Sequence, residues 1–111
     1  MTKVEFTRML LAHLTVIDAQ TQGPAAELSS LAGLWIDGAR AELLERGLCW
    51  WGEDSIPEAV SIPLTEYVAA KCCTAFGRGG KGYEQFEDRA AHRLAKLANS
   101  EERPVVRADY F

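Results

Sequence analysis

At 111 residues, 48% of them hydrophobic, and with a formal net charge of −4 at pH 7, the chain has room for one domain with a modest core. No apolar run approaches the roughly 20 residues that cross a membrane, and the acidic start, Met1-Thr2-Lys3-Val4-Glu5, does not predict a secretion signal. Residues 1–55 hold four Lys or Arg against eight Asp or Glu, and residues 56–111 hold eight against eight, so free nucleic acid is not expected as the main ligand.

A first helix is predicted from about Lys3 to Leu14. Thr2 and Glu5 have the T-x-x-E spacing of a capping box, in which each residue satisfies a backbone donor at the start of a helix. One apolar stripe follows at helical spacing: Phe6, Met9, Leu10, His13, Leu14 and Ile17. Because His13 lies on this stripe, we expect a hydrogen-bonded core histidine rather than a ligand.

A second helix is predicted from Pro24, a favourable first-turn residue, to Arg46, with Gly47 as a left-handed C-cap. Its shared face holds Leu28, Leu31, Ala32, Trp35, Ala39 and Leu43. Two internal glycines each cost about 1 kcal/mol, and Asp37-Gly38 is alternatively a turn that splits the segment. We favour the unbroken helix, because the apolar phase persists across both glycines.

A third helix is predicted from about Pro57 to Phe76, ending at Gly77. Its stripe comprises Val60, Leu64, Tyr67, Val68 and Ala75, and its small residues, which permit close helix approach, are Ala69, Ala70, Cys72 and Cys73. Pro63 lacks the backbone N–H that a helix interior needs, so we expect either a kink or a short lead-in helix before the main one.

A fourth helix is predicted from about Gly82 to Asn99, with Tyr83, Phe86, Ala90, Leu94 and Leu97 facing inward. Acidic residues gather near its start and basic ones near its end, as the helix dipole favours. The fold class is therefore all-α: a four-helix bundle-like domain over residues 1–99, with an extended C-terminal arm over residues 100–111.

No catalytic, cofactor or metal site is predicted. The glycine cluster from Gly77 to Gly82 lacks the Lys and Ser/Thr of a phosphate-binding loop and follows a helix rather than a strand. The three cysteines are odd in number, Cys72 and Cys73 are adjacent, and no pair has zinc-ligand spacing, so we expect reduced thiols as in the cytoplasm. Cys49 with a histidine is a conceivable nucleophile pair, but no orienting acid accompanies it.

Partner binding is the more productive hypothesis for several exposed segments. Trp50 and Trp51 cannot both enter a small core with ease, so one should cover the end of the bundle and the other could anchor an interface. Arg78 and Lys81 in the glycine-rich loop could contact a charged partner. The C-terminal arm either packs back on its own domain or, as we favour, lies along a neighbour through Arg103, Val105, Val106, Arg107, Asp109, Tyr110 and Phe111.

The order of these features resembles the phage head-to-tail adaptor family, also called tail accessory factors or head completion proteins. The first helix ends in Leu14-Thr15-Val16-Ile17-Asp18, and the second carries Trp35 and closes at Glu45-Arg46-Gly47-Leu48. The third begins at Ile56-Pro57, carries Ala69-Ala70 and ends at Phe76-Gly77. Tyr83 opens the fourth, and the chain closes with Asp109-Tyr110-Phe111. The resemblance spans nearly the whole chain, although Pro63 and the short C-terminal region depart from the pattern.

That resemblance implies a helical protomer in a homo-oligomeric ring, commonly of twelve copies, between the portal protein and the tail or nozzle protein of a virion. Such a ring is assembled in the host cytoplasm, extends the DNA channel without sequence-specific binding, and retains packaged DNA. The family's C-terminal tails reach onto the portal, which here assigns that contact to Arg103 through Phe111. No membrane is involved.

Three other functions remain open at this stage. One is a tail-completion protein that binds at the tail end. A second is a small helical regulatory or nucleic-acid-binding module, which would need a basic helix face; the fourth helix offers only Arg89, Arg93 and Lys96 against Glu84 and Asp88. The third is an enzyme, for which fast reaction of Cys49 with a thiol reagent at neutral pH would be a sign.

Overall fold

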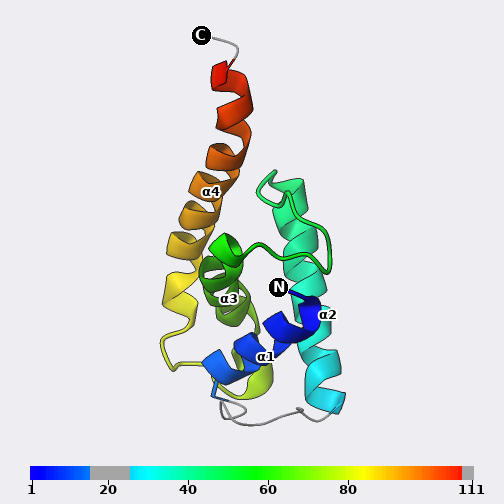
Figure 1. The fold of residues 1–111 in the computed structure, drawn as a ribbon. Coiled ribbons are helices and arrows are strands. Elements are labelled where there is room, and N and C mark those ends of the chain that lie inside the picture. The colour runs from blue at the N-terminus through cyan, green and yellow to red at the C-terminus, as the bar shows by residue number, and fades with distance from the viewer. Residues whose placement is uncertain (16–25, 109–111) are drawn as a thin grey trace.

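The computed structural model of the protein describes the backbone of residues 1–15 and 26–108 and the side chains of residues 1–15 and 26–99. These residues form four α-helices and two short 3₁₀ turns, and no strand is present among them (Figure 1). In chain order the elements are α1 (Lys3–His13), α2 (Ala26–Glu45), α3 (Glu58–Cys72), η1 (Thr74–Phe76), η2 (Glu84–Phe86) and α4 (Glu87–Ala108). The predicted all-α, bundle-like fold is confirmed.

The third helix lies at the centre of the bundle. α3 packs against α1, α2 and α4, and α1 also packs against α2. In the described part of the chain, α4 packs against α3 and η2 and not against α1 or α2 (Figure 1). α3 therefore separates α4 from the α1–α2 pair, and this arrangement decides which surfaces a single copy leaves open.

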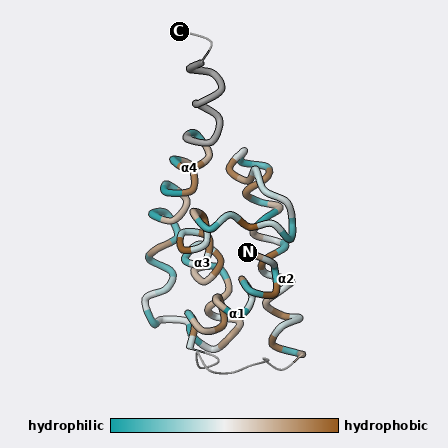
Figure 2. Tube along the Cα trace, in the orientation of Figure 1, coloured by the Kyte–Doolittle hydropathy of each residue, from teal (hydrophilic) through white to brown (hydrophobic). Residues whose placement is uncertain are grey.

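The core consists of apolar side chains from all four helices. The largest that are completely or almost completely buried are Phe6, Leu10, Leu11, Leu14, Leu43, Val60, Tyr67, Val68 and Leu94. Burying each side chain of this size contributes roughly 1.5–3 kcal/mol. Figure 2 shows the same pattern along the chain, with hydrophobic positions of the helices interrupted by hydrophilic ones at helical spacing.

The first helix begins with the predicted capping box. The Glu5 N–H donates to the Thr2 hydroxyl at 3.2 Å, and the Thr2 N–H donates to the Glu5 carboxylate at 2.8 Å. The prediction of a core histidine is wrong, because Leu11 points inward beside Leu10 and the opposite edge of the stripe, which carries His13, faces solvent. Ile17 lies outside the described residues.

The second helix is unbroken across both of its glycines, as favoured from the sequence, and does not split at Asp37-Gly38. Gly47 adopts a left-handed conformation with φ of 72°, and the Leu48 N–H donates to the Leu43 carbonyl at 2.8 Å, which is a Schellman C-cap. On the predicted face Ala32, Ala39 and Leu43 are buried, but Trp35 is 37% exposed and Ile36 is buried in its place. The predicted start at Pro24 lies outside the described residues.

The third helix passes through Pro63 as one element, so the short lead-in helix does not form. It ends at Cys72, four residues earlier than predicted, and tightens into the 3₁₀ turn η1, which exposes Ala75. Gly77 then takes φ of 74° and caps this turn in the way that Gly47 caps α2. Cys72 and Cys73 are both buried, and all three cysteines are free thiols.

The fourth helix is longer than predicted, and the extended conformation expected from residue 100 is wrong for residues 100–108. α4 continues to Ala108: Ser100-Glu101-Glu102-Arg103 contains no glycine or proline, and the helix then passes through Pro104, which lacks the backbone N–H of a regular helical position. Residues 109–111 lie outside the described residues. The end of α4 projects well beyond the other helices (Figure 1), and the molecule measures 52 × 27 × 23 Å.

Candidate functional site

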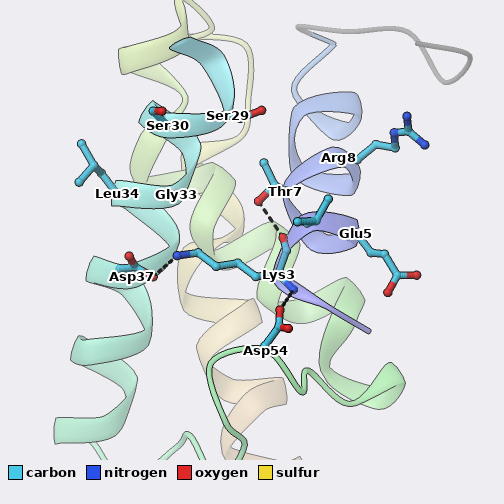
Figure 3. A pocket seen from close by; sticks show the side chains of 11 residues that line it. Lys3, Glu5, Thr7, Arg8, Ser29, Ser30, Gly33, Leu34, Asp37 and Asp54 are labelled. Atoms are coloured by element: carbon cyan, nitrogen blue, oxygen red, sulfur yellow. Dashed lines mark hydrogen bonds and ion pairs between the residues drawn. The ribbon is translucent and has the colours of Figure 1, made fainter. Parts of the chain in front are cut away.

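A groove with a volume of about 1090 Å³ lies between α1 and α2 (Figure 3). We call it the α1–α2 groove, and it is lined by Lys3, Val4, Glu5, Thr7, Arg8, Ser29, Ser30, Gly33, Leu34, Asp37 and Asp54. Its α1 wall begins at the capping box, and its α2 wall includes a glycine. A Cβ added at Gly33 would meet only the end of the Lys3 side chain, at 4.0 Å, so this part of the wall is open.

Lys3 holds the two walls of the groove together. Its ammonium lies 2.7 Å from the Asp37 carboxylate on α2 and 3.5 Å from Glu53 in the following loop, while its backbone N–H donates to Asp54 at 2.7 Å. The hydrogen bond to Asp37 raises the pKa of Lys3 above its ordinary value. The groove thus has a fixed width at this end, with ion pairs whose members are partly exposed.

Two large apolar side chains in the groove are open to solvent. Val4 on α1 is 79% exposed and Leu34 on α2 is 70% exposed. Neither belongs to the apolar stripe of its helix, which faces the core. An isolated exposed apolar residue needs no explanation, but two on opposite walls of one groove are typical of a surface that contacts a partner.

A smaller pocket of about 530 Å³ lies where α2, α3 and α4 meet. Lys71 of α3 lies 3.2 Å from Glu42 of α2 and 3.6 Å from Glu87 of α4, and its ammonium sits 5.0 Å from the centre of the Tyr67 ring. The Tyr67 hydroxyl donates to Glu42, and this hydrogen bond lowers the pKa of the Glu42 carboxyl. This network joins three helices, and the charge of Lys71 is paired with Glu42 and Glu87 within the chain. We therefore assign it a role in stabilising the bundle.

The two adjacent tryptophans divide as the sequence suggested, one inward and one outward. Trp51 is only 6% exposed and belongs to the core, so the prediction that it binds a partner is wrong for this structure. The ring of Trp50 meets that of Trp51 edge to face, with centroids 5.0 Å apart, and stays partly exposed. Only Trp50 remains available at an interface.

The two loop cations also differ. Arg78 donates to the Leu14 carbonyl at 2.9 Å and to the Thr15 carbonyl at 3.1 Å. Its guanidinium therefore caps the end of α1. The partner-binding prediction for Arg78 stays a prediction, and a partner would have to compete with these hydrogen bonds. Lys81 is exposed and remains a candidate contact.

The C-terminal candidates fall in two groups. Arg103, Val105, Val106 and Arg107 lie on the projecting end of α4. Asp109, Tyr110 and Phe111 lie outside the described residues. The partner-binding prediction for these positions stays a prediction.

The basic face of α4 is partly neutralised by α3. Glu66, whose side chain is 14% exposed, receives Arg89 on one carboxylate oxygen and Arg93 on the other, each at 3.0 Å. Arg89 also stacks on the Phe86 ring at 4.6 Å. Two of the three cations that a nucleic-acid-binding helix would need are thus engaged with a carboxylate.

The cysteines and histidines do not converge. Burial raises the pKa of the Cys72 thiol to about 12, which keeps it protonated. Within residues 1–15 and 26–99, no three His, Cys, Asp or Glu side chains come together as metal ligands would. None of the helices in the described part combines the length and the apolar character needed to span a membrane.

Sequence reasoning missed the α1–α2 groove, although a signal was present. Val4 and Leu34 are large apolar residues that fall outside the stripes of their helices, and an apolar residue on the polar side of a helix indicates a surface that function keeps apolar. The pairing of α1 with α2 that brings them to one groove is a tertiary feature.

Comparisons of the chain with protein-family models, with curated proteins and with solved structures found no match. What the chain does is therefore argued from its own residues and surfaces.

Proposed function

We propose that this protein is a structural assembly protein, a head-to-tail adaptor whose copies form a ring between the portal and the tail of a phage particle. In this role it extends the DNA channel and retains packaged DNA, and it performs no chemistry. The observation that carries the proposal is the projecting end of α4, which leaves a bundle whose core is already filled (Figure 1).

The projecting end of α4 lies beyond the other helices of the bundle (Figure 1). The buried α4 side chains in the described part are Ala90, Ala91, Leu94 and Ala98. The residues that follow include the apolar residues Val105, Val106, Tyr110 and Phe111. Apolar residues gain free energy when a partner removes them from water. An apolar segment at the end of a projecting helix is suited to contact another subunit, either the portal or a neighbouring protomer.

Charge supports the same role. Residues 1–55 carry the whole excess of acid, with four Lys or Arg against eight Asp or Glu. An acidic surface along a channel repels the phosphate backbone and lets DNA pass without adhering. A ring also needs two different complementary patches on each protomer, and halves of unequal charge help to provide them.

The test is co-sedimentation with the cognate portal, with full-length protein compared with a version that lacks residues 103–111. We expect the full-length protein to sediment with the portal and the shortened protein to bind at least tenfold more weakly. Equal binding by both versions would remove the C-terminal segment from the proposal. Failure of the full-length protein to bind at all would contradict the adaptor function itself.

A further inference from the structure

We propose that the α1–α2 groove of one copy binds residues 103–108, the end of α4, from a second copy of this chain. This inference rests on the proposed function and deepens it, because it names the contact between neighbouring protomers. It joins two features of the described residues, the α1–α2 groove and the projecting end of α4.

A copy cannot fill the groove with its own α4. The groove lies between α1 and α2, whereas α4 packs on the far side of α3 and does not approach either helix in the described part of the chain (Figure 1). α4 is 22 residues long, about 33 Å at the helical rise, and its end points away from the bundle. The projecting end is thus directed toward another molecule.

The groove has the size and surface of a site for a chain segment. Its volume of about 1090 Å³ exceeds the roughly 300–1,000 Å³ typical of small-molecule pockets. Val4 on α1 and Leu34 on α2 are exposed apolar residues of the lining. Gly33 on the α2 wall leaves room for a side chain to enter (Figure 3). Val105 and Val106 supply apolar side chains of matching character.

Charge favours the same pairing. Residues 103–108, Arg-Pro-Val-Val-Arg-Ala, contain two arginines and no acid. The groove is lined by three carboxylates, Glu5, Asp37 and Asp54, against two cations, Lys3 and Arg8. A basic apolar segment and a groove with an excess of acid attract each other, which sets the orientation of docking and speeds encounter.

The geometry of this contact is head-to-tail, as a ring requires. The segment and the groove are different surfaces, so the contact is heterologous, and each copy has one of each free for the next copy. Repetition of such a contact closes into a ring where the rotation between copies permits. A two-fold dimer would instead need one surface that pairs with itself.

Photocrosslinking of the intact chain tests the contact. We place p-benzoylphenylalanine at position 106, mix light and ¹⁵N-labelled protein in equal amounts at about 1 mM, which captures even weak association, and locate the crosslinks by mass spectrometry. We expect mixed-isotope crosslinks that map to Lys3–Arg8 and to the α2 wall between Ser29 and Asp37.

Two matched variants identify the groove. Gly33→Leu fills it, because only the flexible end of Lys3 lies within 4 Å of an added Cβ, whereas Gly38→Leu places the same side chain on the same helix where nothing lies within 4 Å. Both replacements favour the helical conformation, so both proteins should fold. We expect Gly33→Leu to lower the yield of crosslinks at least tenfold and Gly38→Leu to leave it unchanged.

The contrary outcomes are equally definite. Crosslinks confined to one copy, crosslinks that map outside the groove, or their absence at this concentration would overturn the inference. So would a loss of crosslinks in Gly38→Leu with none in Gly33→Leu, which would point to the pocket between α2, α3 and α4. Whether the full-length protein binds the portal at all is measured separately by the co-sedimentation experiment, so failure of the groove contact and failure of the adaptor function are distinguishable.

Discussion

Arg78 shows how one side chain can fix the relation of two elements that are far apart in sequence. Its hydrogen bonds to the carbonyls of Leu14 and Thr15 satisfy acceptors that the end of α1 leaves without helical partners. Thr15 also has a φ of 58°, a conformation that β-branched residues rarely adopt, and its hydroxyl accepts a third hydrogen bond from Arg78 at 3.3 Å. The guanidinium thus stabilises a strained turn.

We expect Arg78→Ala to lower the free energy of unfolding by about 1–2 kcal/mol, because it removes charge-assisted hydrogen bonds to backbone carbonyls. Lys81→Ala is the matched control. It removes a cation from the same loop where the side chain is exposed, and should change the free energy by less than about 0.5 kcal/mol. Urea unfolding followed by circular dichroism measures both values, and equal effects would show that Arg78 does not act as a cap.

At the scale of the elements, Tyr67 and Lys71 of α3 connect the two helices that flank it. The Tyr67 hydroxyl donates to Glu42 of α2, and Lys71 lies between Glu42 and Glu87 of α4. Because the hydrogen bond from Tyr67 lowers the pKa of Glu42, the folded protein holds fewer protons there than the unfolded chain. The resulting stability is present above the ordinary pKa of a glutamate and is lost as the pH falls through the lowered value.

Tyr67→Phe should therefore destabilise the protein by about 1 kcal/mol at pH 7, a modest value because Glu42 is partly exposed. The difference from the unaltered protein should shrink as the pH falls from 7 through the lowered pKa of Glu42, below which the carboxyl is protonated in both states. Tyr83→Phe is the control, since the Tyr83 hydroxyl donates to the backbone carbonyl of His13, which does not titrate. Chemical denaturation across this pH range would contradict the assignment if both differences stayed constant.

The elements themselves could largely be predicted from the sequence, because their signals are local. The capping box at Thr2 and Glu5 marks the start of α1, and Gly47 and Gly77 mark the ends of α2 and η1. Orientation about a helix axis could not be predicted, because it depends on packing partners. The placement of His13 at the surface is one example.

The functional surfaces were less predictable for the same reason. A basic residue in a glycine-rich loop has the same sequence signature whether it caps a distant helix, as Arg78 does, or stays exposed, as Lys81 does. Of two adjacent tryptophans, only the path of the loop decides that Trp51 is the buried one. The α1–α2 groove needs two helices from different parts of the chain, and no local pattern reports their pairing.

At the scale of the whole molecule, the division between a filled bundle and a projecting helix predicts separable stability and assembly. We expect removal of residues 103–111 to change the free energy of unfolding by less than about 0.5 kcal/mol, because this end of α4 projects beyond the other helices (Figure 1). Leu94→Ala, at a fully buried position of the same helix, should cost about 2–5 kcal/mol.

Guanidinium unfolding of both variants checks this expectation. Should the shortened protein lose as much stability as Leu94→Ala, the end of α4 would belong to the protomer's own core. The separation of bundle and projecting end would then be wrong, and with it the main support for an assembly role.

Because the end of α4 projects from the bundle, assembly should depend on the number of residues between the bundle and that end. Each residue inserted after Asn99 would advance the end by about 1.5 Å and rotate it by about 100° about the helix axis. One added residue would therefore turn Val105 and Val106 toward a different direction, whereas seven added residues, about two turns, would restore the direction and displace it by about 10 Å. Insertions between Asn99 and Arg103 should accordingly impair assembly with the period of the helix rather than in proportion to their length.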